Sequence, residues 1–360
     1  MTTVYAIYGD IGGAKETLPA MQAVSKKGVV VRHFVSGDRA RAGIDVLDKA
    51  LVPYETRGPQ TDDKPALIVV GTNATAVQGQ IGWTKFGRDR GIPVLWIEDL
   101  WGAGETEKTQ VVSPDTMCVI DTIAGRIAQN VRPHMQVNVV GKPSFAALAK
   151  KLENLEESRA TTRAQLAARL GITNFNGHIV TYGSGGEVPT RVYIHLQALR
   201  DLGLSTNKEV IFVPRFHPKL SDDDKQHVRI LSFTVGTYVV MAHDLDMDFI
   251  TVSSDVNIGE WGSTTMYTSV LFGVPAIMCM FPDDRGRRLA LGYPNGVPPL
   301  LMAEAGRGPT DITLLHDALN EILCAPEQYR EMTRKNGAVF RTLLEPGAED
   351  RIAEVVMSYL

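Results

Sequence analysis

The stretch that decides the fold covers residues 248–281 and reads DFITVSSDVNIGEWGSTTMYTSVLFGVPAIMCMF. Its apolar, β-branched start at residues 249–252 predicts a short buried strand. A loop is expected next, through Asp255, Asn257 and Gly259. After the loop, residues 276–281 are again continuously apolar and predict a second buried strand. The stretch therefore predicts two neighbouring strands of one sheet.

A helix is predicted between these two strands. It begins at the small and hydroxyl-bearing residues Gly262, Ser263, Thr264 and Thr265, and the pair Gly273 and Pro275 ends it. In a strand-loop-helix-strand unit, the free amides at the start of the helix lie at the carboxyl edge of a parallel sheet, where they can bind an anion. We expect residues 262–265 to bind a phosphate. The alternative is that small residues here only allow the helix to start.

Composition limits the possible classes of protein. The chain has 360 residues, of which 44% are hydrophobic and 22% are charged, as in ordinary globular proteins. Its length favours two domains over one. A net charge of −4 gives no broad basic surface, so a general nucleic-acid-binding or membrane-surface protein is disfavoured.

The cysteines and the hydrophobic runs point to a cytoplasmic protein. Cys118, Cys279 and Cys324 are odd in number and far apart, which predicts free thiols in a reducing compartment. No apolar run is long enough to span a bilayer. The chain also opens directly on a strand-like run at residues 4–8, without the features of a secretion signal.

The first half of the chain opens like a Rossmann-like domain. The predicted strand at residues 4–8 leads through Asp10, Gly12 and Gly13 into a helix at residues 14–26. The glycine turn lacks the full GxGxxG pattern, so a nicotinamide or flavin site is not expected. Further strands alternate with helical segments, which predicts a parallel sheet covered on both faces. These strands are expected at residues 29–35, 67–70, 94–98, 117–120 and 137–140.

The second half repeats this alternation. A strand at residues 178–182 ends in Gly183, Ser184 and Gly185, and a strand at residues 209–214 leads into Arg215 and His217. The predicted fold class is therefore α/β. We expect an N-terminal Rossmann-like domain over residues 1–145, linking helices over 146–170, a C-terminal Rossmann-like domain over 171–345 and a final helix over 346–360.

A series of motifs, taken in order along the chain, resembles the glycosyltransferase B-type fold, and specifically its UDP-N-acetylglucosamine 2-epimerase branch. GTNAT (residues 71–75), GIP (91–93) and WIE (96–98) resemble the Gly-Asp, Gly-Ile-Pro and His-Val-Glu segments of the N-terminal domain. VVGKP (139–143) resembles the strand end that closes this domain. RFHP (215–218) resembles Arg/Lys-x-His-Pro, and GSTTMYTSVLFGVP (262–275) resembles Gly-x-Ser-Thr-x-x-x-Glu-Ala-x-x-x-Gly-x-Pro.

The resemblance implies two Rossmann-like domains that face each other across a cleft, with the C-terminal helix crossing back to the N-terminal domain. It also implies a nucleotide-sugar, UDP-linked, that is bound mainly by the C-terminal domain. Two positions depart from the pattern: Thr72 replaces the epimerase aspartate, and Thr268 replaces the glutamate that binds the nucleotide ribose. Threonine offers the ribose fewer hydrogen bonds than a carboxylate does, and Glu260 is a candidate substitute.

Transfer of a sugar requires that the leaving diphosphate be neutralised and that the acceptor be deprotonated. We expect Glu98 to be the base, with Asp10 as the second choice, and His217 to stabilise charge. Gly12 and Gly13 are expected in the loop on the acceptor side. Neither a cofactor nor a metal is expected. The expected donor- and phosphate-binding residues are Gly183, Ser184, Gly185, Arg215, His217, Gly262, Ser263, Thr264, Thr265 and Thr268.

The leading hypothesis is a metal-independent glycosyltransferase that uses a nucleotide-activated sugar and an acceptor that the sequence does not identify. A nucleotide-sugar 2-epimerase is the main alternative, although Thr72 argues against epimerase acid–base catalysis. A binding protein that kept the fold and lost the chemistry is a third hypothesis. A nucleic-acid acceptor is disfavoured by the net charge, and the chain is expected to be a monomer or a homodimer.

Overall fold

The chain forms two compact units in the computed structural model. Unit 1 comprises Met1–Ala149, Gly286–Val297 and Thr342–Leu360, and unit 2 comprises Lys150–Arg285 and Pro298–Arg341. Helix α5 (Pro143–Lys151) contains the first boundary between them. The structure describes residues 2–37, 41–72, 77–102, 104, 108–183, 197–198, 209–215, 222–223, 226, 238–242, 244–282 and 285–360.

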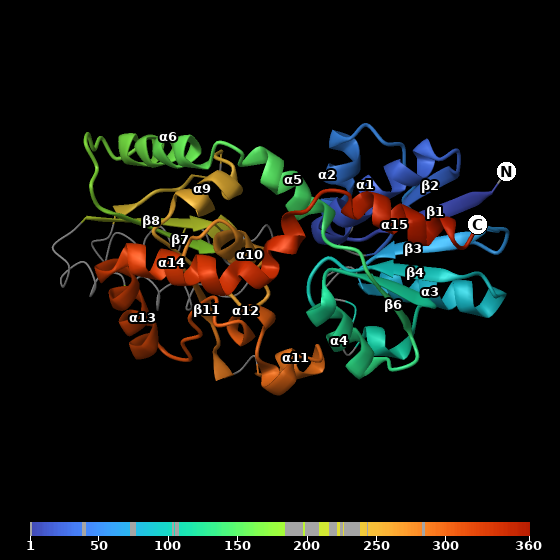
Figure 1. Cartoon of the computed structure of the whole chain (residues 1–360). Coiled ribbons are helices and arrows are strands. Elements are labelled where there is room, and N and C mark those ends of the chain that lie inside the picture. Colours follow the sequence, from blue (N-terminus) through green and yellow to red (C-terminus); the bar gives the residue numbers. More distant parts are fainter. Residues whose placement is uncertain are drawn as a thin grey trace. The chain divides into compact units, whose positions relative to one another are not determined.

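Unit 1 is built on a parallel sheet with the strand order β2-β1-β3-β4-β5-β6. Its strands are β1 (Thr3–Tyr8), β2 (Val30–Val35), β3 (Leu67–Gly71), β4 (Val94–Ile97), β5 (Thr116–Val119) and β6 (Gln136–Val139). Helices lie on both faces of this sheet (Figure 1). One face carries α1 (Ile11–Lys26), α2 (Arg41–Lys49) and α15 (Ala348–Met357), and the other carries α3 (Val77–Arg90) and α4 (Thr122–Val131).

The C-terminal helix belongs to unit 1, as the resemblance predicts. In α15, Ile352, Ala353 and Val356 are fully buried in the same hydrophobic core as Met21 of α1. Arg351 of α15 also donates a hydrogen bond from Nε to the carbonyl oxygen of Val140, at 2.8 Å. Burial of this apolar face against α1 fixes the last helix to the first sheet.

The first turn of α1 packs directly on the end of β3. A Cβ atom at Gly13 would lie 2.5 Å from the carbonyl oxygen of Thr72, and a Cβ atom at Gly71 would lie 2.8 Å from the carbonyl oxygen of Gly13. Real side chains do not approach backbone atoms this closely, so only glycine fits at these two positions. The contact holds the start of α1 against the carboxyl edge of the sheet.

Gly13→Ala is expected to lower the free energy of unfolding by about 2 kcal/mol, because the new methyl group must displace backbone. Gly82→Ala is the matched control: Gly82 lies inside α3, and a Cβ atom there would have no neighbour within 4 Å. The control should stabilise the protein by roughly 0.5–1 kcal/mol through helix propensity. Urea denaturation measures both values, and equal effects of the two substitutions would contradict the packing argument.

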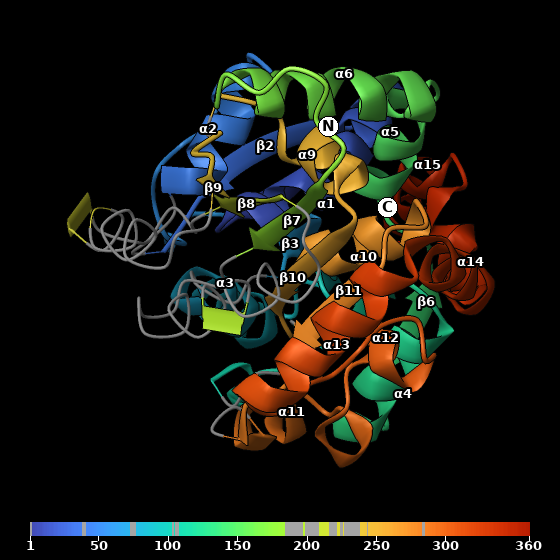
Figure 2. The same ribbon diagram turned by 90° about the vertical axis from the view of Figure 1, so that its left-hand side faces the viewer.

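Unit 2 contains a second parallel sheet, with the strand order β11-β10-β7-β8-β9. Its strands are β7 (His178–Gly183), β8 (Val210–Arg215), β9 (Tyr238–Val239), β10 (Val256–Glu260) and β11 (Ala276–Cys279). Helices α6 (Leu155–Ala168) and α9 (Met247–Ser253) cover one face, and α13 (Ile312–Cys324) covers the other (Figure 2). Helix α10 (Thr264–Leu271) packs on β10, β11 and α9.

The remaining helices connect or flank these layers. Their bounds are η2 (Thr109–Val111), α11 (Arg285–Ala290), η4 (Pro294–Gly296), α12 (Pro299–Met302), α14 (Pro326–Asn336) and η5 (Gly337–Leu344). Within the described parts of the chain, no helix is long and apolar enough to cross a membrane. All three cysteines are free, and Cys324 is exposed whereas Cys118 and Cys279 are buried.

Two elements of the stretch at residues 248–281 differ from the sequence prediction. The predicted strand at residues 249–252 is helix α9, which begins where the Asp246 side chain accepts a hydrogen bond from the amide of Asp248. The predicted loop through Asn257 and Gly259 is instead the buried strand β10. Asn257 is satisfied inside the fold, since its Nδ2 donates to Ser269 Oγ at 2.7 Å. Gly259 leaves room for the side chain of Met266.

Candidate functional site

In unit 1, polar residues gather where three adjacent strands end. Asp10 follows β1, Thr72 follows β3, and Glu98 and Asp99 follow β4. Because the carboxyl ends of parallel strands share one edge of the sheet, the four residues lie together there. This is the edge at which open α/β sheets bind their ligands.

Asp10 and Asp99 both border the first turn of α1. Asp10 is the N-cap residue of this helix, and its Oδ1 accepts a hydrogen bond from the amide of Gly13 at 3.2 Å. A Cβ atom at Gly12 would lie 2.3 Å from Oδ2 of Asp99 and 3.5 Å from Oδ1 of Asp10. The glycine therefore makes room for the Asp99 carboxylate beside the positive end of the helix.

Glu98 is enclosed by backbone. Its side chain is only 3% exposed. Oε1 accepts a hydrogen bond from the amide of Gly102 at 2.9 Å, and Oε2 accepts one from the amide of Ile120 at 3.3 Å. Burial raises its pKa well above the usual value of a glutamate, although the two amides oppose this effect. Glu98 thus ties the segment after β4 to the end of β5.

Asp99 is partly exposed and is oriented by Thr72. The Thr72 hydroxyl donates to Oδ1 of Asp99 at 2.9 Å and accepts from the amide of Asp99 at 3.1 Å. Burial, followed by the negative charge of Asp10, raises the pKa of Asp99 to about 7, whereas Lys142 and the Thr72 hydrogen bond act to lower it. A carboxyl group of this kind can both accept and release a proton near neutral pH.

A buried ion pair supports this arrangement. Lys142 and Glu16 are 3% and 2% exposed, and Lys142 Nζ lies 2.6 Å from Oε1 of Glu16. Lys142 Nζ also donates to the carbonyl oxygen of Asp99. Ser144 donates to Glu16 from its amide at 3.0 Å and from its hydroxyl at 2.6 Å. The pair joins the segment after β6 to α1 and to the backbone of Asp99.

Asp99 is expected to make stability depend on pH. Its pKa is about 7 in the folded chain and about 4 in an unfolded one. Between these values the folded state binds more protons, so the free energy of unfolding falls as the pH rises. Asp99→Asn should remove the pH-dependent part of the free energy of unfolding that comes from Asp99. The substitution should therefore stabilise the protein more at about pH 8 than at about pH 5. Urea denaturation at both pH values measures the change, and an equal change at both would contradict the prediction.

In unit 2, the described donor-site candidates also lie at the carboxyl edge of the sheet. Gly183 of β7 is in register with Arg215 of β8 on one side and with Gly259 of β10 on the other. A Cβ atom at Gly183 would lie 2.9 Å from Oγ1 of Thr265 and 3.5 Å from Oγ of Ser263. Glycine thus lets the end of β7 lie close to the start of α10.

The start of α10 carries two hydroxyl groups that bond to each other. Ser263 is the N-cap residue, and its side chain makes no capping hydrogen bond to the helix. Its Oγ instead lies 2.6 Å from Oγ1 of Thr265. Ser263 and Thr265 are half-buried, and Gly262 and Thr264 are exposed. This first turn offers amides and hydroxyls to an incoming anion.

Three further side chains of unit 2 differ in burial and in the hydrogen bonds that they already make. Arg215 donates from Nη1 to the carbonyl oxygens of Ala242, at 2.7 Å, and Leu245, at 3.3 Å. Thr268 is buried inside α10. Glu260 ends β10, is buried, and accepts a hydrogen bond from the Tyr182 hydroxyl at 3.3 Å. Burial lowers the pKa of Arg215.

Ser184, Gly185 and His217 lie outside the residues that the structure describes. The expectation that Glu98 and Asp10 line one opening with residues 262–265 stays a prediction, because these residues belong to different units. Within the described chain, no group of three or more histidine, cysteine, aspartate or glutamate side chains is arranged to hold a metal ion.

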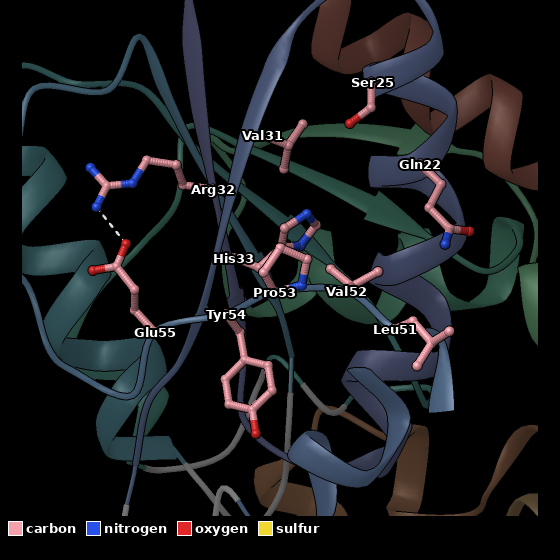
Figure 3. A pocket seen from close by; sticks show the side chains of 10 residues that line it. All are labelled: Gln22, Ser25, Val31, Arg32, His33, Leu51, Val52, Pro53, Tyr54 and Glu55. Carbon is pink, nitrogen blue, oxygen red and sulfur yellow. Dashed lines mark hydrogen bonds and ion pairs between the residues drawn. The ribbon is translucent and has the colours of Figure 1, made fainter. Parts of the chain in front are cut away.

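Unit 1 also has a cavity of about 470 Å³ away from this edge (Figure 3). It is lined by the last turns of α1, by Val31, Arg32 and His33 of β2, and by residues 51–55. The Tyr8 hydroxyl lies 2.8 Å from Nδ1 of His33, and burial lowers the pKa of His33 to about 4. None of the sequence-predicted site residues lines this cavity, so it is separate from the predicted site.

The unit 1 edge also involves residues that were not predicted as site residues from the sequence, among them Asp99, Lys142 and Glu16. Asp99 directly follows the predicted strand that ends at Glu98, so its position at the strand end was a usable signal. Lys142 lies in the quoted VVGKP motif, after another strand end. Glu16 carries no comparable signal, because an acidic residue in the second turn of a helix is most often solvated.

Comparison with known proteins supports the fold. No protein-family model and no curated protein matches the sequence. Among solved structures, UDP-GlcNAc 2-epimerase from Neisseria meningitidis, bound to UDP-GlcNAc, is 14% identical, with a TM-score of 0.68 over 99% of this chain and 100% of that one. UDP-GlcNAc 2-epimerase from Methanocaldococcus jannaschii is 12% identical, with a TM-score of 0.65 and the same coverage of each chain.

A third solved structure covers the chain equally. MurG from Acinetobacter baumannii is 12% identical, with a TM-score of 0.57 over 99% of this chain and 100% of that one. At such identities the likeness establishes the fold and nothing further. The prediction of fold class is confirmed: this chain has the glycosyltransferase B-type fold, with two Rossmann-like units that each contain a parallel sheet.

Proposed function

We propose that this protein is a glycosyltransferase that uses a nucleotide-activated sugar, with the donor bound mainly by unit 2. The observation that carries the proposal is the different chemistry at the two carboxyl edges. The edge of unit 1 gathers the carboxyl groups of Asp10, Glu98 and Asp99. At the edge of unit 2, Gly183 lies close to the hydroxyl groups of Ser263 and Thr265.

These two chemistries match the two needs of glycosyl transfer. As the bond to the leaving diphosphate breaks, the amides at the start of α10 can stabilise the growing negative charge. A carboxylate of unit 1 can take the proton from the acceptor hydroxyl. Because helix amides supply the positive field, we expect the reaction to need no metal, and EDTA should leave the rate unchanged.

The nucleotide is expected to be UDP. The epimerase from Neisseria meningitidis, whose fold this chain shares, was solved with UDP-GlcNAc bound. Thr268 is buried, whereas Glu260 lies at the end of β10 beside the start of α10. We therefore propose Glu260 as the group that accepts hydrogen bonds from the ribose hydroxyls. The free cysteines favour a cytoplasmic location, which suits a consumer of nucleotide-sugars.

A UDP-GlcNAc 2-epimerase is the second candidate. It is supported by the motifs that resemble the epimerase branch and by the epimerases among the solved structures that share this fold. Thr72 argues against it, because it places a hydroxyl where the resemblance implies an acid–base aspartate.

Incubation with UDP-GlcNAc alone, followed by NMR, separates the two candidates. An epimerase converts the sugar to its 2-epimer without an acceptor, whereas a transferase leaves the sugar intact until an acceptor is added. A thermal-shift screen with nucleoside diphosphates and nucleotide-sugars selects the donor first, since a ligand that binds the folded state raises the melting temperature. No stabilisation by any nucleotide would contradict both candidates.

A further inference from the structure

We propose that Asp99 is the catalytic base of this site, and that it replaces the aspartate which the resemblance implies at position 72. The inference deepens the proposed function and rests on it. In this chain the carboxylate lies on the segment after β4 and not at the end of β3, and Thr72 holds it in place. The edge of unit 1 therefore keeps a carboxylate although position 72 is a threonine, and we assign this carboxylate to the acceptor hydroxyl of the transferase.

The hydrogen bonds between Thr72 and Asp99 support this assignment. Thr72 is fully buried, and its hydroxyl donates to the Asp99 carboxylate while it accepts from the Asp99 amide. Both bonds are made by one oxygen atom, so the position of the carboxylate relative to the end of β3 is fixed. Oδ2 of Asp99 faces Gly12 in the first turn of α1, where any larger residue would collide with it.

The two carboxylates predicted from the sequence are less suited to act as the base. Both carboxylate oxygens of Glu98 accept hydrogen bonds from backbone amides, and the side chain is buried. Asp10 is engaged as the N-cap of α1. Asp99 is more exposed than Glu98, and the structure gives its two oxygens different surroundings, with Oδ1 on Thr72 and Oδ2 at the glycine turn.

The surroundings of Asp99 suit proton transfer near neutral pH. Burial and the charge of Asp10 raise its pKa to about 7. Lys142 opposes this rise and also donates to the Asp99 carbonyl oxygen, which fixes the backbone. The charged or titratable groups that face Asp99 from neighbouring elements are Asp10, Glu16, Glu98, Lys142 and Tyr293.

The proposed step is a proton transfer coupled to sugar transfer. Asp99 takes the proton of the acceptor hydroxyl as the acceptor oxygen forms its bond to the anomeric carbon. The bond from that carbon to the diphosphate oxygen breaks, and its electron pair leaves with the nucleoside diphosphate. Asp99 ends the step protonated and returns the proton to solvent.

The first test is Asp99→Asn, with the donor and acceptor found by screening. Loss of a general base should lower kcat by about 10²–10⁴-fold, while the Kd of UDP changes less than about two-fold because the donor binds to unit 2. Asp62→Asn is the matched control, since Asp62 is an exposed carboxylate elsewhere in unit 1, and it should leave kcat unchanged.

The pH profile of kcat/KM distinguishes the carboxylates. Glu98→Gln should keep this profile, whereas Thr72→Val should move the acidic limb of the profile to higher pH.

The second test exchanges the two residues. Thr72→Asp with Asp99→Thr places the carboxylate where the resemblance implies it and the hydroxyl beside it. The kcat of the double variant should be at least about ten-fold higher than that of Asp99→Asn, because the base returns to the same edge of the sheet. Equal activity of the double variant and Asp99→Asn would overturn the assignment.

A third measurement does not depend on turnover. The carboxyl carbon resonance of Asp99, assigned by its loss in Asp99→Asn, should titrate near the pKa of about 7, and Thr72→Val should raise that value. Titration below about pH 5 would overturn the inference even if no substrate is found. An active parent protein with full activity in Asp99→Asn would also overturn it and leave the proposed function intact. Failure to bind any nucleotide would instead count against the proposed function.

Discussion

Lys142→Met is expected to lower the free energy of unfolding by about 3–5 kcal/mol, because it leaves a buried charge without its partner. The remaining charge is that of Glu16, which is 2% exposed and lies 2.6 Å from Lys142 Nζ in the native chain. Ser144 keeps its two hydrogen bonds to Glu16, but neither of these neutralises the carboxylate. The variant also removes the donor to the carbonyl oxygen of Asp99. Urea denaturation measures the loss.

The double variant Glu16→Gln/Lys142→Met is the control that isolates the charge. Glutamine keeps one oxygen that can accept from the Ser144 amide, and its NH2 group can donate to the Ser144 hydroxyl. The double variant therefore has no uncompensated charge and should regain more than half of the stability lost. If Lys142→Met alone costs less than about 1 kcal/mol, the pair is hydrated in solution and does not hold α1 to the segment after β6. If the double variant is as unstable as the single one, packing of the lysine stem carries the effect.

Most strands could be predicted from the sequence because buried parallel strands are short, continuous apolar runs. The runs at residues 4–8, 67–70 and 276–281 correspond to β1, β3 and β11. The wrong prediction of a loop at residues 255–259 has a physical cause. Strand β10 contains Asn257 and Gly259, which disfavour strands, and these residues are accepted only because Ser269 and Met266 of α10 complement them. Such tertiary contacts are not visible in local sequence.

Residues of the candidate site could be predicted from the sequence only where they directly follow a predicted strand. Asp10, Glu98 and Gly183 follow strand-like runs, so their place at a carboxyl edge follows from the fold. The exposure of these side chains to solvent or ligand does not follow from the fold. Glu98 and Asp99 are adjacent in sequence, yet the first is closed by two backbone amides and the second is partly exposed beside Gly12. Part of that difference comes from Ile120 after β5 and from Gly12 in α1, which the sequence around residue 98 does not contain.

Ser263→Glu is expected to raise the Kd of UDP by at least about 100-fold, because a negative charge at the start of α10 would repel the diphosphate. Ser263 is the N-cap residue of this helix, and its Oγ lies 2.6 Å from Oγ1 of Thr265 and beside Gly183. An acidic residue near a helix start stabilises the helix by roughly 0.3–1 kcal/mol. The variant should therefore stay folded, and its melting temperature without ligand should be no lower than that of the parent.

Ser263→Ala is the control for this variant. It removes the hydroxyl without adding charge, so the Kd of UDP should rise no more than about ten-fold, the value of one hydrogen bond. Isothermal titration calorimetry with UDP measures the parent and both variants. A large loss in Ser263→Glu with a small loss in Ser263→Ala assigns the effect to charge at the helix start. If Ser263→Glu binds UDP as the parent does, the diphosphate does not lie at α10, and the proposed transferase loses the group that would stabilise its leaving diphosphate.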